Sequence, residues 1–185
     1  ILVTQLFEEM GFHGSTLDYH HRSNSFINEV MDDREGLPIT LSILLIELAQ
    51  RLDLPVSGIG LPGHFMAIYR EDSNSLDEKN PRPAKEFLID AFGGKIVSRK
   101  EASEIIGLPL DDEDFHPIPK KDIITRVLRN LINSADQERD REARLRYVNA
   151  LVAVDPADRY NRTMRALSHY GEEPVSYTHL TLPTM

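Results

Sequence analysis

The histidines are the side chains of this chain most suited to chemistry near neutral pH, because an imidazole titrates there and also binds metals. Four of the seven histidines lie in predicted loops, at His13, His20, His21 and His116. No pair has the helical H-x-x-x-H or H-E-x-x-H spacing of a metal site, and the adjacent His20 and His21 would point in different directions in most backbones. We therefore expect no metal and no cofactor.

Cysteine is absent from all 185 residues. This excludes disulfides, thiolate metal sites and a cysteine nucleophile, and it fits the cytoplasmic location that we expect. The chain carries a net formal charge of −9, yet residues 120–170 hold 11 Lys and Arg against 7 Asp and Glu. Because the rest of the chain is acidic, a nucleic-acid surface is not expected. No apolar segment reaches the ~20 residues of a membrane span, so no membrane is expected either.

Both ends of the sequence look unlike natural chain ends. Residue 1 is Ile and lies inside a predicted helix, so we expect a piece that is truncated at its N-terminus. Residues 175–184 read VSYTHLTLPT, which is the translation of a transposon adapter used in sequencing libraries. We interpret 175–185 as an artefact of sequencing and exclude it from the fold.

The groups that could do chemistry must be positioned by a small number of helices and strands. Short helices are predicted at 1–10 and 25–34, and a longer one begins at Pro38, since proline is favoured in the first turn of a helix. Its apolar positions are spaced at three and four residues, which predicts a buried helix that ends near Asp53; they are Leu41, Leu44, Leu45, Leu48, Ala49 and Leu52.

Strands follow this helix. Segments 56–61, 64–69, 86–92 and 95–97 are rich in β-branched and aromatic residues and are bounded by glycine or proline, whereas 71–85 is polar and predicts a loop. Ser98 and Glu101 have the spacing of a capping box for a helix that runs to about 106. We expect an α/β core over 1–106, an acidic, proline-rich linker over 107–119, and a helical tail over 120–174 with helices at 120–134, 139–154 and 156–170.

The segment NSFINEVMDDREGLPITLSILLIELAQRLDLPVSGIGLPGHFMAIY, residues 24–69, resembles the core of the bacterial SirB-type family of the transglutaminase-like superfamily. The resemblance extends from residue 6 to about 170. It implies an α+β fold: a papain- or transglutaminase-like core, with a small antiparallel sheet against a buried helix, followed by tetratricopeptide-like helices.

The resemblance also implies positions for a catalytic triad. Active members read G-V-C at the start of the buried helix and L-G-I-P at its end. Here Gly36 and Pro55 are 19 positions apart, as in the active pattern, and the cysteine position falls on Pro38. His64 matches the family histidine and Asp90 the family aspartate. Two members of the triad therefore have counterparts, and the nucleophile has none.

Two hydroxyls near the start of the same helix leave an alternative open. Ser42 or Thr40 could act as the nucleophile with His64 and Asp90, although a helical serine more often bonds back within its own helix. A structural pair between strands is the interpretation that we favour for His64 and Asp90.

We therefore predict a non-catalytic regulatory or protein-interaction module, whose unknown protein partner would bind the helices of 120–170. The first alternative is a hydrolase or acyltransferase that uses Ser42 or Thr40. The second is a domain that binds a small ligand or a metal in the same cleft.

Overall fold

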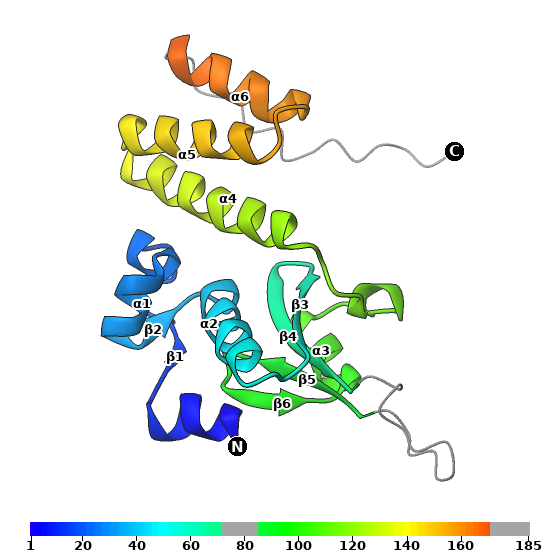
Figure 1. The fold of residues 1–185 in the computed structure, drawn as a ribbon. Helices are drawn as coiled ribbons and strands as arrows, with labels where there is room; N and C mark the ends of the chain where they lie inside the picture. Colours follow the sequence, from blue (N-terminus) through cyan, green and yellow to red (C-terminus); the bar gives the residue numbers. More distant parts are fainter. Residues whose placement is uncertain (72–84, 171–185) are drawn as a thin grey trace.

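The computed structural model describes residues 1–71 and 85–170, without the side chain of Tyr170 (Figure 1). Most of the predicted loop 71–85 and the suspected adapter segment 175–185 lie outside the described residues. Within the described part, an α/β layer carries a stack of three helices at one end (Figure 1). This is the α+β arrangement that the resemblance implied.

The central helix is α2 (Pro38–Arg51). Proline occupies its first turn, and the alternating three- and four-residue spacing of its apolar side chains buries most of its surface. Leu41, Leu45 and Ala49 have no exposed surface. The helix ends where Asp53 takes a left-handed conformation with φ of 54°, close to the predicted end.

A four-stranded antiparallel sheet packs against α2. Its strands lie in the order of the chain: β3 (Val56–Leu61), β4 (His64–Arg70), β5 (Glu86–Asp90) and β6 (Lys95–Val97). Three strands match the predicted segments to within one residue. The fourth, β5, ends at Asp90 and not at Phe92, because the Asp90 carboxylate turns back to accept the Phe92 N–H.

Strand β4 is buried on both of its faces, which explains why it reads as a nearly continuous apolar run. Phe65 and Ala67 of β4 join the cluster around α2, whereas Met66 and Ile68 point to the other side and pack with Leu88, Val97, Ala102 and Phe115. Ala102 belongs to α3 (Arg99–Ile106), which begins with the predicted capping box between Ser98 and Glu101.

The N-terminal region is more broken than predicted. The first helix is centred on a π-helical stretch, η1 (Thr4–Glu9), and the predicted helix 25–34 is divided into η2 (Arg22–Ser25) and α1 (Ile27–Asp33). Phe26 lies extended between the two, with φ −99° and ψ 119°. Two short strands that were not predicted, β1 (His13–Gly14) and β2 (Glu35–Gly36), pair in parallel.

Residues 107–119 pass along β3. They contain η4 (Glu113–Phe115), whose Phe115 is buried, and Pro117 forms an isolated bridge with Ile59. The Ile118 N–H also donates to the oxygen of Gly58 at 2.9 Å. This segment therefore delivers the chain to the helical tail along one edge of the sheet.

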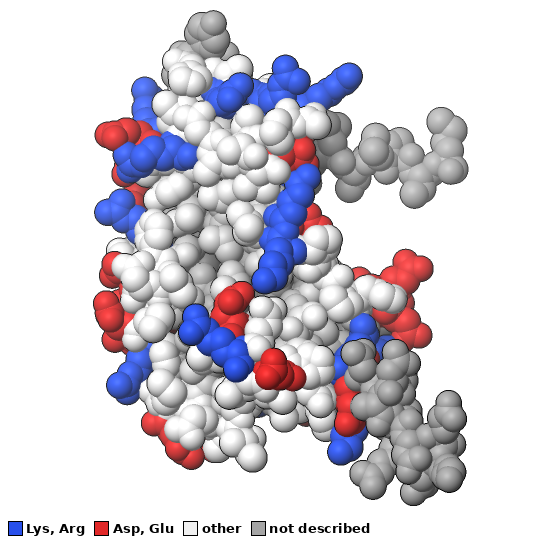
Figure 2. Space-filling model, in the orientation of Figure 1, with Lys and Arg blue, Asp and Glu red and all other residues white. Residues whose placement is uncertain are grey.

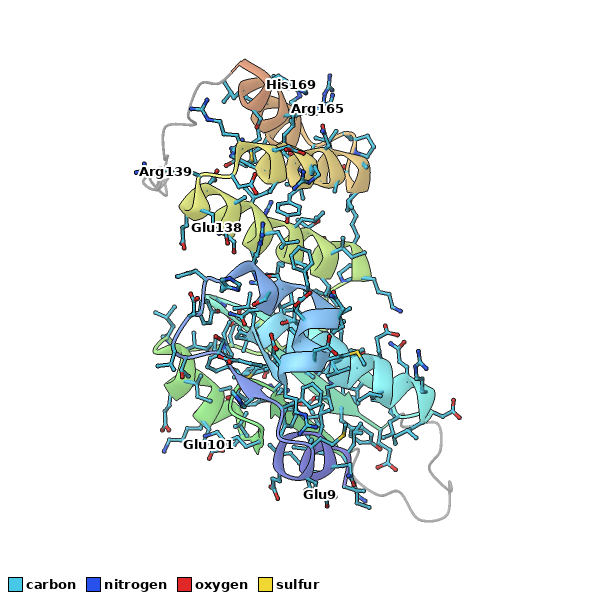
Figure 3. The ribbon with its side chains drawn as sticks, turned by 90° about the vertical axis from the view of Figure 1, so that its left-hand side faces the viewer. Glu9, Glu101, Glu138, Arg139, Arg165 and His169 are labelled. Carbon is cyan, nitrogen blue, oxygen red and sulfur yellow. The ribbon has the colours of Figure 1, made fainter. Side chains whose placement is uncertain are left out.

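The tail consists of α4 (Lys120–Glu138), α5 (Arg141–Val154) and α6 (Arg159–Tyr170), stacked in that order away from the core (Figures 1 and 3). Ile132, Val148 and Leu151 form a small core between them. The helix α4 is longer than predicted, and α6 begins at Arg159 and not at Pro156.

The tail is joined to the core through α4. Ser134 donates to the oxygen of His20 at 2.8 Å. Glu138, labelled in Figure 3, lies 3.7 Å from Arg22. Among the described residues, no helix is long and apolar enough to cross a membrane.

Candidate functional site

His64 and Asp90 form a largely buried pair at one end of the sheet. His64 opens β4 directly after a turn in which Gly63 has φ +66°, and Asp90 closes the neighbouring β5. The imidazole Nε2 lies 3.0 Å from Asp90 Oδ1. Their side chains are only 12% and 5% exposed. The structure thus brings together the two triad residues that the resemblance implied.

The carboxylate of Asp90 is held in its ionised form. Burial by itself would raise its pKa, but the hydrogen bond from His64, the backbone N–H of Gly93, the charge on His64 and the N–H of Phe92 together keep the pKa below its usual value. A side chain at Gly93 would not fit, since a Cβ there would lie 2.5 Å from Asp90 Oδ2. The close approach of the backbone at Gly93 therefore helps to stabilise the Asp90 carboxylate.

The ionised carboxylate also fixes the tautomer of His64. A carboxylate can only accept, so Nε2 must carry the proton that it donates. In the neutral ring, Nδ1 is then the basic nitrogen, and no described residue forms a hydrogen bond with it. The Phe92 ring meets the imidazole edge-on, with centroids 6.3 Å apart, which restrains the orientation of the ring. The pair could therefore serve as an oriented base.

A cavity of about 240 Å³ lies beside this pair. Pro38, at the start of α2, lines it together with His64. The remaining lining residues come from the core and from α4: Tyr19, Ile39, Gly63, Phe65, Arg126, Arg129 and Asn130. The position implied for the nucleophile thus opens on the same cavity as the histidine, but it carries a proline ring without a nucleophilic atom.

Thr40 has a structural role at the start of α2. Its hydroxyl accepts the N–H of Leu37 at 3.0 Å and lies 2.6 Å from the oxygen of Asn24, to which it donates. The side chain is buried and does not line the cavity. The hydroxyl is therefore engaged in closing the first turn of the helix.

Ser42 is fully buried, and its Oγ has no hydrogen-bond partner among the described residues. It does not line the cavity either. Neither Ser42 nor Thr40 is hydrogen bonded to His64 in the described part of the chain.

Sequence reasoning missed the residues that α4 contributes. Arg126 donates from Nη1 to the oxygen of His64 at 3.0 Å and from Nη2 to the oxygen of Leu61 at 2.9 Å. Arg129 and Asn130 follow on the same side of the helix. One local feature of the sequence could have indicated these residues. No acid occupies the positions three or four residues from Arg129, whereas a helix face stabilised by ion pairs carries acids at that spacing.

The histidines in loops remain apart from this site. Among residues 1–71 and 85–170, no three His, Asp or Glu side chains are grouped so that they could hold a metal ion. His21 instead lies 2.6 Å from the hydroxyl of Ser23, at the start of η2.

A family model described as the transglutaminase-like superfamily matches residues 1–129. The chain therefore belongs to the transglutaminase-like superfamily. Bacterial relatives confirm the resemblance more closely. The chain is 32% identical, over 136 residues, to a UPF0162 protein of Xylella fastidiosa, a match that covers 68% of the chain and 44% of the relative.

Other relatives match at lower identity. A UPF0162 protein of Pasteurella multocida is 26% identical over 90% of the chain and 61% of its own length. The human F-box only protein 21 is 27% identical over 72% of the chain but only 21% of its own length. The chain thus spans less than half of the Xylella relative. No solved structure matches.

Proposed function

We propose that this chain is a non-catalytic transglutaminase-like domain that acts by binding, as a regulatory or protein-interaction module. One observation carries the proposal: Pro38 lines the cavity at the implied nucleophile position, beside a complete His64–Asp90 pair. Proline in a chain has neither a thiol, a hydroxyl nor a free amine. The pair therefore has a base and an orienting carboxylate, but the implied nucleophile position offers it no side-chain nucleophile.

The two hydroxyls that could replace the thiol are poorly placed for this role. A nucleophile and its base need to come within hydrogen-bond reach, or to reach it when substrate binds. Thr40 is committed to Leu37 and Asn24. Ser42 is fully buried and away from the cavity lining. This supports the non-catalytic reading over a serine or threonine hydrolase.

A structural reason accounts for the His64–Asp90 pair without catalysis. The hydrogen bond joins the first residue of β4 to the last residue of β5, so it ties two strands together where their ladder ends. A hydrogen bond to a charged group contributes about 1.5–3 kcal/mol. The same contact therefore stabilises the sheet even when no reaction follows.

The experiment is labelling with a fluorophosphonate probe, which reacts with activated serines and threonines. We expect no labelling of the wild-type chain above that of the His64→Ala variant. Labelling that disappears in both Ser42→Ala and His64→Ala, or in both Thr40→Ala and His64→Ala, would establish the hydrolase alternative. A known serine hydrolase in the same reaction confirms that the probe is active.

The surface that we propose for a protein partner is the outer helix of the tail. Arg159, Arg162 and Arg165 recur along α6, which contains no Asp or Glu. Figure 2 shows basic side chains at the end of the molecule where α6 lies, and Figure 3 labels Arg165 and His169 on this helix. Among the described residues, none of the three arginines pairs with a carboxylate. Charge complementarity favours an acidic segment as the partner.

A labelled oligoglutamate peptide tests this surface by fluorescence anisotropy. Replacing Arg159, Arg162 and Arg165 by Gln should abolish binding at low salt. The matched control replaces three exposed cations elsewhere by Gln, at Arg51, Lys100 and Arg141, so that the net charge changes equally. Equal weakening by both triple variants would show that net charge alone, and not α6, attracts the peptide.

A further inference from the structure

Two arginines of α4 bring uncompensated positive charge to the cavity beside His64. Arg126 and Arg129 are one helical turn apart and both line it, and none of the nine lining residues is acidic. Among the described residues, neither guanidinium forms an ion pair. In contrast, many other arginines of this acidic chain do, namely Arg22, Arg70, Arg99, Arg144 and Arg146.

The backbone holds Arg126 in place without neutralising it. Two of its five N–H groups donate to the oxygens of Leu61 and His64, and its guanidinium lies 5.9 Å from the centre of the Phe65 ring. Gly60 makes room for it, since a Cβ there would lie 3.1 Å from Nη1. The two backbone oxygens and the face of the Phe65 ring orient the Arg126 guanidinium. Because none of them carries a net negative charge, the positive charge of Arg126 remains available to bind an anion.

The positive charges of Arg126 and Arg129 destabilise the fold when no anion lies between them. Burial lowers the pKa of Arg126, and the charge of Arg129 lowers it further. Two like charges near each other destabilise a fold, and an anion between them would reverse the sign of that interaction.

Further donors face the same space. Asn130 carries a side-chain amide and Tyr19 a phenol, and both line the cavity. The N-terminus of the 14-residue helix α2 opens there too, through Pro38 and Ile39. The positive end of the helix dipole therefore adds to the field of the two arginines.

We infer that this cavity binds a small oxyanion, a carboxylate or a phosphate group, between Arg126 and Arg129. Guanidinium groups match both anions by paired hydrogen bonds. A volume of about 240 Å³ is below the roughly 300–1,000 Å³ of pockets that enclose drug-sized molecules, so the occupant is a small metabolite. This inference rests on the proposed function and extends it, because it names the class of ligand that the non-catalytic cavity binds.

The test is isothermal titration of the whole chain with inorganic phosphate and, separately, with succinate, at an ionic strength held constant with sodium chloride. The main variant is Arg129→Gln, because Arg129 is exposed and makes no hydrogen bond that the fold requires. The matched control is Arg141→Gln, which removes the same charge from an exposed position at the start of α5.

We expect at least one of the two anions to bind the wild type and the Arg141→Gln variant with the same affinity. Loss of a charge-assisted hydrogen bond should weaken its binding to Arg129→Gln about tenfold or more. Binding of succinate alone would identify a carboxylate ligand, and binding of phosphate alone a phosphate ligand. No heat from either anion, or equal weakening in both variants, would overturn the inference.

The outcome of the anion titration is independent of the outcome of the fluorophosphonate labelling that tests the proposed function. Failure of anion binding leaves a non-catalytic domain with a different ligand. Labelling by the fluorophosphonate probe would instead contradict the absence of catalysis, whatever the cavity binds.

Discussion

Arg126 of α4 donates a hydrogen bond to the main-chain oxygen of His64, 62 positions earlier in the chain, at 3.0 Å. The helical tail is therefore tied to the turn that presents the histidine. Movement of α4 would change both the lining of the cavity and the backbone that carries His64. The candidate site thus belongs to the core and the tail together.

Gly60→Ala should disturb this contact. The added methyl would lie 3.1 Å from Nη1 and 3.2 Å from Cζ of Arg126, so the guanidinium must shift and its bonds to the backbone weaken. We expect a loss of about 1 kcal/mol in the free energy of unfolding, measured by urea denaturation. In an Arg126→Gln background the same substitution should cost clearly less. Additive costs in the double variant would show that Gly60 does not serve Arg126.

Pro38→Cys places a thiol at the start of α2. The helix dipole favours its thiolate by up to ~1 kcal/mol, and His64, Arg126 and Arg129 line the same cavity. The thiol pKa should therefore fall below the free value of about 8.5, as measured by the pH dependence of iodoacetamide alkylation in the folded variant.

The control for this prediction is the same cysteine in a His64→Ala background. There the pKa should be higher than in the single variant, because one stabilising group has gone. An unshifted pKa in Pro38→Cys itself would mean that the histidine is not poised over the helix start, and the correspondence with a triad would then be accidental.

Asp90→Asn should destabilise the fold in a pH-dependent way. The pKa of Asp90 is lowered in the folded state, so its ionised form contributes stability that is complete above the pKa of the unfolded chain. That contribution is lost as pH falls through the folded pKa. We expect a cost of about 1.5–3 kcal/mol at pH 7, shrinking below about pH 4. Denaturation at a series of pH values measures it, and a constant difference from the wild type down to pH 3 would refute this linkage.

Thr40→Val and Ser42→Ala should differ in their effect on stability although the two hydroxyls are two positions apart. Thr40→Val leaves the N–H of Leu37 and the oxygen of Asn24 with one partner fewer, which should cost about 1–3 kcal/mol. Ser42 Oγ has no partner to lose among the described residues, so Ser42→Ala should be neutral or stabilising. Thermal melts of both variants decide the matter, and a comparable loss in Ser42→Ala would reveal a partner for its hydroxyl.

The elements that the sequence predicted well are those with strong local signals. Pro38 and the apolar spacing after it predicted α2, and Ser98 with Glu101 predicted the start of α3. Both signals act within one or two turns of the chain, so they need no tertiary information. The family resemblance added His64 and Asp90, which the structure brings within 3.0 Å.

The predicted boundaries that proved wrong depend on contacts beyond the local pattern. The helix predicted at 25–34 is broken at Phe26, and β5 stops at Asp90 because its carboxylate bonds to the following turn. The apolar periodicity of the sequence predicts neither the break at Phe26 nor the end of β5 at Asp90. Apolar spacing gives the type of an element more securely than its ends.

The sequence by itself therefore determined the class of fold and the missing thiol, and through the family resemblance it selected His64 and Asp90 as a pair. Only the tertiary structure decided that Thr40 and Ser42 lie outside the cavity lining and that Arg126 and Arg129 lie within it. The reason is physical: Arg126 of α4 lies 62 positions from His64 of β4, and the docking of α4 depends on packing and backbone hydrogen bonds across the whole domain. A local pattern can place a charge on a helix, but it cannot show which distant turn that charge will meet.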